Sequence, residues 1–155
     1  MEKIFANRIN AFLPNIFPLA FIIDNKEIVF LGKLTESEIS PFCLNNNIPK
    51  LVMEDIWERI NRPYLDTEFD EEEKIANDMV LFKNGIESTE LSSIRKKVKM
   101  TMIKNYYAWA WVYLGQYDYL SWTILTNKKY WWTMDIALRG FNSVQIKTPP
   151  PKHSL

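Results

Sequence analysis

The aromatic stretch NYYAWAWVYLGQYDYLSWTILTNKKYWW, residues 105–132, most constrains what this chain can fold into. It holds five of the six tryptophans and six of the seven tyrosines. From residue 105 to residue 127 the only formal charge is Asp118, and a segment of this length could span a bilayer. However, Gln116, Asp118 and the tyrosine hydroxyls need water or polar partners, and tryptophan and tyrosine favour the membrane interface over its hydrocarbon centre. The stretch therefore predicts a packed core or a docking surface, and no membrane span.

Length and charge fit one ordinary globular domain. A chain of 155 residues can bury a core without disulfides or metals. Lysine plus arginine (19) balances aspartate plus glutamate (19), so no net field draws the chain toward nucleic acid or an anionic membrane. Cys43 is the only cysteine, which fits a reducing compartment. We expect one domain over residues 1–147, a disordered proline-rich tail over residues 148–155, and a cytoplasmic location, because polar residues interrupt the apolar N-terminal segment.

The N-terminal part of the chain predicts a hairpin followed by a short helix. PLAFIIDNKEIVFL, residues 18–31, has two apolar runs around a polar turn at residues 24–27. Thr35 and Glu38 have the spacing of a capping box, which predicts a helix over residues 36–44.

Two further helices are predicted in the middle of the chain. Pro49 suits the first helical position before LVMEDIWERI, and Pro63 ends that pattern. Asp70 can cap a helix whose first turn is acidic and which ends near Asn84–Gly85. Val52, Ile56 and Ile60 have helical spacing in the first pattern, and the second helix is expected to run through Ile75, Met79 and Phe82.

The longest helical pattern starts at Ser88 and runs into the aromatic stretch, with Gly115 as its natural end. Its apolar stripe comprises Leu91, Ile94, Val98, Met102, Tyr106, Trp109 and Tyr113. A second apolar face comprises Met100, Ile103, Tyr107 and Trp111. A helix that is apolar nearly all round is either central in the core or meets a partner on its second face.

Asp118 and Thr126 are candidate caps of two short helices, the second of which carries Trp131, Trp132, Ile136 and Ala137. Asp135 and Arg139 have ion-pair spacing in that helix. After Gly140, the alternation of Phe141, Val144 and Ile146 permits a third strand. We therefore predict an α+β fold that is predominantly helical, with the N-terminal hairpin and a permitted C-terminal third strand packed on a helical bundle.

The residue types that usually carry catalysis or metal binding are scarce. The only histidine, His153, lies in the proline-rich tail, and a lone cysteine with a lone histidine offers too few ligands for structural zinc. Cys43 has no basic neighbour in sequence, and four scattered glycines form no phosphate-binding loop. The acidic segment DTEFDEEE, residues 66–73, lacks the ligand spacing of a calcium loop. We expect a non-enzyme without catalytic residues, metal or cofactor.

Binding to another protein is the function that we expect, as in an inhibitor, an immunity-type protein or an adaptor. Eleven tyrosines and tryptophans are many to enclose in so small a domain, and exposed aromatics dominate interface hot spots. An acidic segment would favour a basic partner. The candidate partner-binding residues are Trp109, Trp111, Tyr117, Tyr119, Trp122, Tyr130, Trp131, Trp132, Asp66, Glu68, Asp70, Glu71, Glu72 and Glu73.

Nucleic-acid binding is the alternative, with basic side chains flanking the aromatics so that charge and base stacking act together. The candidate residues are Arg95, Lys96, Lys97, Lys99, Lys104, Lys128 and Lys129. The balanced net charge argues against this alternative, and the same basic run also fits the solvated face of a helix. A third hypothesis is a pocket for a small planar ligand among the tryptophans.

Overall fold

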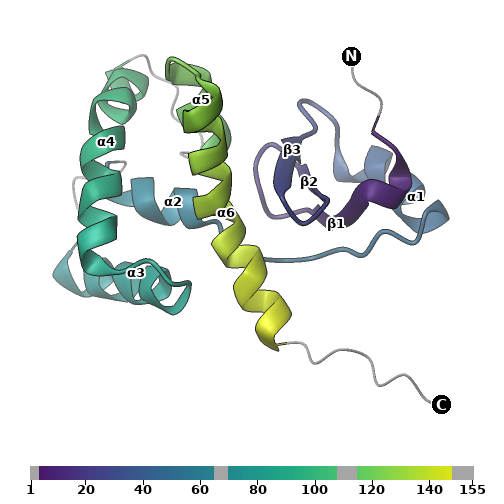
Figure 1. Ribbon diagram of the computed structural model, residues 1–155, viewed down its shortest axis with the longest axis horizontal. Coiled ribbons are helices and arrows are strands. Elements are labelled where there is room, and N and C mark those ends of the chain that lie inside the picture. The colour runs from purple at the N-terminus through teal and green to yellow at the C-terminus, as the bar shows by residue number, and fades with distance from the viewer. Residues whose placement is uncertain (1–3, 65–69, 108–114, 148–155) are drawn as a thin grey trace.

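The computed structural model describes residues 4–64, 70–107 and 115–147 and has an α+β fold (Figure 1). After a short 3-10 turn, η1 (Ala6–Arg8), three strands form an antiparallel sheet of order β1–β2–β3: β1 (Ile9–Leu13), β2 (Ala20–Ile23) and β3 (Glu27–Phe30). The helices are α1 (Glu36–Asn45), α2 (Ile56–Asn61), α3 (Glu71–Lys83), α4 (Ser88–Tyr107), α5 (Gln116–Trp122) and α6 (Asn127–Lys147), with a 3-10 turn, η2 (Arg62–Tyr64), after α2. The predicted fold class is confirmed.

The hairpin between β2 and β3 turns at two residues with positive φ. Asp24 and Asn25 have φ of 53° and 51°, a conformation that aspartate and asparagine tolerate better than most residues. Residues before and in β1 hold the turn: Arg8 Nη2 donates to Asp24 at 2.7 Å, and Asn10 Oδ1 accepts from the Asn25 N–H at 2.6 Å. The predicted hairpin is confirmed, and β1 stabilises its turn.

The third strand of the sheet is β1, at the N-terminus. The prediction that residues 141–146 could form a third strand is wrong, because these residues continue α6. The position of Gly140 suggested that it would end the helix, but α6 continues past it. A Cβ there would lie 2.4 Å from the backbone oxygen of Glu54, so the glycine allows α6 to pack closely against the segment before α2.

The start of α2 also differs from the prediction. Residues 49–51 cover the outer edge of β1, where Phe12 N–H donates to Pro49 O at 2.9 Å and Leu51 N–H donates to Phe12 O at 2.8 Å. The helix therefore begins only at Ile56, where Asp55 Oδ1 accepts from the Glu58 N–H at 3.0 Å. Val52, expected on the apolar face of this helix, lies before it and is exposed.

The predicted helix over residues 36–44 is confirmed as α1, and Glu38 accepts from the Thr35 N–H at 2.8 Å, as the capping box requires. Alternation along β2 sends Phe21 and Ile23 toward α1. The resulting small core contains Ile9, Phe12, Phe21, Ile23, Ile39, Cys43 and Ile48.

The main core lies on the opposite face of the sheet, where β2 contributes Ala20 and Ile22. At its centre Trp57 is fully buried and donates Nε1–H to Thr133 O at 3.0 Å, which joins α2 to α6. The predicted stripe of α4 is confirmed for its described members, since Leu91, Ile94, Val98 and Met102 are all buried. The side chains of Tyr106, Trp109 and Tyr113 lie outside the described part of the chain.

The long helix α6 links the two parts of the molecule, because it lies between the sheet and helices α2 to α4 (Figure 1). Its predicted cap is confirmed by Thr126 Oγ1, which accepts from the Lys129 N–H at 3.3 Å. Asp118 is not the cap of α5. Gly115 holds that position, and Asp118 lies one turn inside, accepting from the Gly115 N–H at 3.2 Å. Of the helices described, none has the length and apolar character needed to cross a membrane.

Candidate functional site

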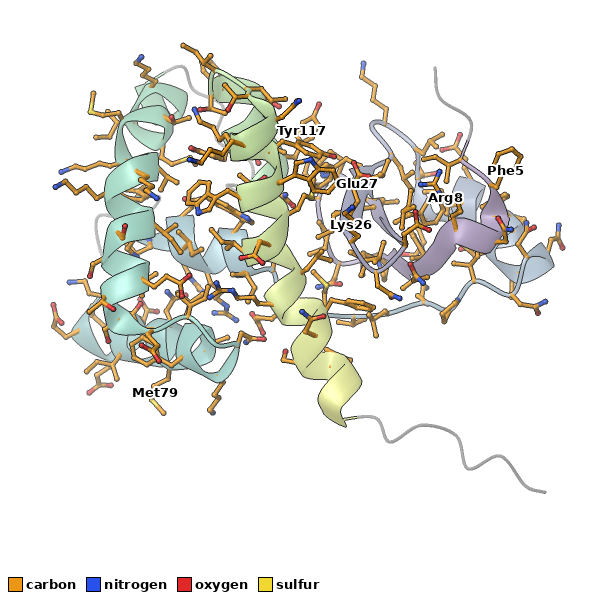
Figure 2. The ribbon with its side chains drawn as sticks, in the orientation of Figure 1. Phe5, Arg8, Lys26, Glu27, Met79 and Tyr117 are labelled. Atoms are coloured by element: carbon orange, nitrogen blue, oxygen red, sulfur yellow. The ribbon has the colours of Figure 1, made fainter. Side chains whose placement is uncertain are left out.

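The outer side of α3 leaves three large apolar side chains in solvent. Ile75, Met79 and Phe82 are 61, 50 and 44% exposed, and their spacing places them on one side of the helix. Figure 2 shows Met79 pointing away from the rest of the molecule. We refer to these three residues as the α3 face. The sequence predicted the helix and its Asp70 cap correctly, but it did not indicate which side of the helix faces solvent.

Polar contacts on the inner side of α3 fix its rotation. Asn77, only 2% exposed, donates Nδ2–H to Arg59 O at 2.9 Å, and Asp78 accepts from Arg95 Nη2 at 2.7 Å. Leu81 is fully buried on the same side. Hydropathy could not reveal this orientation, because Asn77 and Asp78 are less apolar than the residues that remain outside. The contacts that decide the orientation are those with the backbone oxygen of Arg59 on α2 and the guanidinium of Arg95 on α4.

The first turn of α3 adds negative charge to one end of the α3 face. Asp70 Oδ1 accepts from the Glu73 N–H at 2.8 Å, and Glu71, Glu72 and Glu73 are all exposed. Glu72 precedes Ile75 by three residues, so it continues the same side of the helix. Lys74 Nζ lies 2.7 Å from Glu71 Oε1, a solvent-exposed pair. The predicted partner residues Asp66 and Glu68 fall outside the described residues.

The predicted aromatic residues do not form one surface. Tyr119 is only 2% exposed and stacks on Trp57 with ring centroids 5.1 Å apart, so almost none of this side chain is open to solvent. Tyr130 and Trp132 are half-buried. Trp109 and Trp111 fall outside the described residues.

Three predicted aromatic rings reach solvent, from separate places. Tyr117 on α5 packs edge-on against Phe30 of the sheet, with centroids 5.4 Å apart. Trp131 lies beside the hairpin turn, where Lys26 Nζ is 5.1 Å from its ring centroid. Trp122 ends α5 and precedes the exposed Ile124 and Leu125 of the connection to α6.

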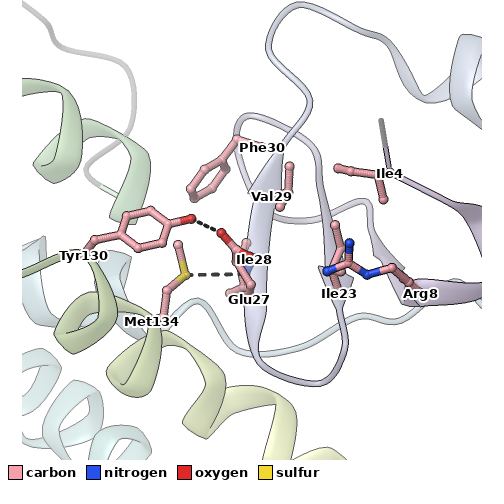
Figure 3. Close-up of a pocket in the computed structure, with 9 residues that line it drawn as sticks. All are labelled: Ile4, Arg8, Ile23, Glu27, Ile28, Val29, Phe30, Tyr130 and Met134. Carbon is pink, nitrogen blue, oxygen red and sulfur yellow. Dashed lines mark hydrogen bonds between the residues drawn. The ribbon is translucent and has the colours of Figure 1, made fainter. Parts of the chain in front are cut away.

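A cleft of about 420 Å³ runs around β3, at the edge of the sheet (Figure 3). On the α6 side, the hydroxyl of Tyr130 hydrogen-bonds the carboxylate of Glu27, and the Ile28 N–H meets Met134 Sδ at 3.4 Å. Burial, together with the hydrogen bond and charge of Glu27, raises the pKa of Tyr130 well above its usual range. The phenol therefore stays protonated, and this contact fastens the sheet to α6.

The predicted basic residues also separate. Arg95 faces α3, where it pairs with Asp78 at 2.7 Å. Lys97 lies two residues further along, about 200° around the helix, and faces α6, where its Nζ is 5.1 Å from the ring centroid of Trp132. These two basic residues of α4 therefore lie on different sides of the helix.

Three of the predicted lysines instead line one cleft of about 430 Å³ between α4, α5 and α6, which we call the lysine cleft. Lys97 enters it from α4, and Lys128 and Lys129 enter it from the first turn of α6. The rings of Tyr119 and Trp132 line it as well. Basic side chains were expected to flank the aromatics, but the sequence did not indicate which lysines and which rings would meet.

Hydroxyl groups complete the lining of the lysine cleft. Thr101, Thr123 and Thr126 each contribute a side chain. Lys129 Nζ donates to Thr123 Oγ1 and to Ile124 O, both at 2.9 Å, so its position is fixed. Thr126 was predicted only as a helix cap, and the sequence did not relate the three threonines, because nothing in their spacing connects them.

Cys43 is buried in the small core under α1, and burial raises the pKa of its thiol. A protonated, enclosed thiol is a poor nucleophile. Among the residues that the structure describes, no group of three or more histidine, cysteine, aspartate or glutamate side chains could hold a metal ion.

No protein-family model, no curated protein and no solved structure matches this chain.

Proposed function

We propose that this chain is a non-enzymatic protein-binding domain, of the inhibitor, immunity-type or adaptor kind, that contacts its partner through the α3 face. The observation that carries the proposal is the exposure of Ile75, Met79 and Phe82 on a helix whose opposite side is anchored by Asn77 and Asp78. Because the anchoring contacts fix the rotation, the helix cannot hide this stripe without breaking them. Contiguous apolar surface of this kind marks protein contact sites.

The chemistry of the α3 face suits an apolar helix or groove with basic residues at one end. Burying three half-exposed apolar side chains contributes about 1 kcal/mol each. Met79 can adapt its shape to the partner because its side chain is unbranched and flexible. Glu71, Glu72 and Glu73 would speed association with a basic partner by electrostatic steering.

Tyr117, Trp122 and Trp131 belong to a second contact region in this proposal. All three are exposed aromatics, the residue class that most often anchors interfaces. They lie on α5 and α6, whereas α3 lies at the opposite end of α4 (Figure 1). A partner that covers the α3 face would not need to reach them.

Site-specific crosslinking in the native cell tests the proposal. A photoreactive diazirine analogue of methionine replaces Met79, and the same residue replaces Leu44, which is 78% exposed at the end of α1, as a matched control. We expect a discrete covalent adduct with a second protein from position 79 and none from position 44. Glu71→Lys together with Glu72→Lys should lower the adduct yield by slowing association.

Two outcomes would contradict this proposal. Equal adducts from both positions would mean that the α3 face has no specific partner. An adduct at twice the mass of the chain would mean that the face pairs with a second copy. Light scattering of the purified protein gives an independent reading of that second outcome, since a Met79→Glu substitution would then convert a dimer to a monomer.

Nucleic-acid binding remains the second candidate, and the lysine cleft is the observation that favours it, because three lysines and two aromatic rings meet there. A surface that follows a nucleic-acid backbone needs a longer row of cations. Arg95 is engaged by Asp78 on another side of α4 and does not extend the row. Fluorescence of the tryptophans during titration with a single-stranded oligonucleotide at two salt concentrations tests this candidate, and no change at low salt would dismiss it.

A further inference from the structure

The lysine cleft concentrates positive charge without the negative charge that would balance it. Three ammonium groups line it, and none of its lining residues in the described part of the chain carries a carboxylate. Among the ion pairs between described residues, none involves Lys97, Lys128 or Lys129. Like charges drawn into one cleft repel one another, and an anion placed among them would relieve that repulsion.

Two of the three ammonium groups are held in place before any ligand arrives. Lys129 Nζ is fixed by Thr123 Oγ1 and Ile124 O at 2.9 Å each. Lys97 Nζ lies over the ring of Trp132, whose negative face attracts a cation. Because these side chains are already ordered, a ligand loses less conformational entropy on binding than it would among mobile lysines.

The rest of the lining accepts both a polar and an apolar group. Hydroxyls of Thr101, Thr123 and Thr126 can donate hydrogen bonds to anionic oxygens. The half-buried ring of Trp132, which contacts the buried ring of Tyr119 edge-on, offers apolar surface beside them. The volume of about 430 Å³ lies in the range of small-molecule sites.

We propose that the lysine cleft binds a small phosphate monoester that carries a planar ring. Its phosphate lies among Lys97, Lys128, Lys129 and the threonine hydroxyls, and its ring packs on the half-buried ring of Trp132. A phosphate fits better than a carboxylate because its larger charge and additional acceptor oxygens use several ammonium and hydroxyl donors at once. This site is independent of the α3 face.

The proposal favours a small ligand over a nucleic-acid strand because the cations of the cleft end abruptly. Lys96 neighbours Lys97 in sequence but does not line the cleft, and Arg95 is paired with Asp78. One phosphate with its ring fits this footprint, whereas a strand would need further cations along its path.

Isothermal titration of the full chain at low salt tests the proposal with two probes, adenosine 5′-monophosphate and phenyl phosphate. Adenosine, which lacks the phosphate, and inorganic phosphate, which lacks the ring, are the matched ligands. We expect at least one phosphorylated ring compound to bind about tenfold more tightly than either matched ligand, because each of these loses one of the two kinds of contact.

Variants of the lysines locate the site. Lys128→Gln and Lys97→Gln should each weaken binding of the phosphorylated probe by about tenfold. Lys96→Gln removes the same charge from the neighbouring position on α4 and should leave binding unchanged, since Lys96 does not line the cleft. Circular dichroism of each variant should match the wild type, because all three side chains are exposed.

Three results would overturn the proposal. The first is no saturable binding of either probe at millimolar concentration. The second is an equal loss of affinity in Lys96→Gln, which would mean diffuse electrostatic attraction only. The third is a single-stranded oligonucleotide whose affinity rises steadily with its length and falls in Lys96→Gln, which would assign the lysines to a nucleic-acid surface instead.

Discussion

At the residue scale, Asp118 is a carboxylate whose charged form the folded state disfavours. It lies half-buried in the first turn of α5, where it accepts the Gly115 N–H at 3.2 Å. Burial raises the pKa of Asp118 to about 6, helped by the negative charge of Asp55 and opposed by the backbone hydrogen bonds. Since the folded pKa lies above the unfolded one, the folded state favours the neutral carboxyl. The stability that this provides is complete below about pH 4 and is lost as the pH rises through about 6.

Replacing Asp118 with asparagine should therefore stabilise the protein at neutral pH but not in acid. Asparagine is neutral throughout and keeps an oxygen that can accept the Gly115 N–H. We expect equal free energies of unfolding near pH 4, and an advantage for Asp118→Asn of about 1 kcal/mol by pH 7, after allowing for solvent screening of a half-buried group. Urea titrations across this pH range measure the difference. An offset that is the same at every pH would contradict the assigned pKa shift.

At the element scale, the chain shows which features of a helix are local and which are not. The capping box of α1, the Asp70 cap of α3 and the buried stripe of α4 were predicted because each depends on residues three or four apart. The start of α2 was not predicted correctly, because residues 49–51 form backbone hydrogen bonds with β1 instead of joining the helix. The rotation of α3 about its axis was not predicted, because it is set by hydrogen bonds to the Arg59 backbone oxygen on α2 and from the Arg95 side chain on α4.

The candidate site also combines local features, which the sequence predicted, with features that depend on packing between elements, which it did not. Sequence alone placed Lys97 on a helix and Lys128 and Lys129 near the start of another, but only packing brings these helices to one cleft. The acidic turn of α3 was found because it is continuous in sequence. The α3 face was missed because a helical apolar stripe predicts burial equally well whether a partner or the core covers it.

Two substitutions two residues apart, about 200° around α3 from each other, test its orientation. Leu81→Ala opens a cavity at a fully buried position and should lower the free energy of unfolding by about 2–5 kcal/mol. Met79→Gln alters a half-exposed side chain without much change in helix propensity, so it should change stability by less than about 0.5 kcal/mol. Chemical denaturation followed by tryptophan fluorescence measures both. A large loss in Met79→Gln would place this residue in the core.

At the scale of the whole molecule, the sheet separates two cores of unequal size. The main core extends through α2, α4 and α6, whereas the small core under α1 contains seven buried residues. Phe12 and Phe21 pack edge-on there, with ring centroids 5.8 Å apart, beside Cys43. Fewer apolar contacts hold α1 than hold the central helices, so α1 should open more readily than the remainder.

The thiol of Cys43 reports that opening directly, because it is the only cysteine in the chain. We expect a thiol reagent under native conditions to give a free energy of opening smaller than the global free energy of unfolding measured by tryptophan fluorescence. All six tryptophans lie at residue 57 or beyond, so fluorescence reports the helical part and not α1. Leu81→Ala should lower the global value while leaving the opening of α1 nearly unchanged. Coincident free energies in the wild type would mean that the two cores unfold as one unit.

The contact between β3 and α6 also has a consequence for how the protein is made. Tyr130 and Glu27, which fasten the sheet edge to the last helix, are 103 residues apart. A ribosome adding about 5–20 residues per second would expose the edge of β3 for about 5–20 s before the helix that covers it has been synthesised. During that interval the nascent sheet presents an open strand to other chains, so correct folding of this protein in the cell depends on keeping translating copies apart until α6 has emerged.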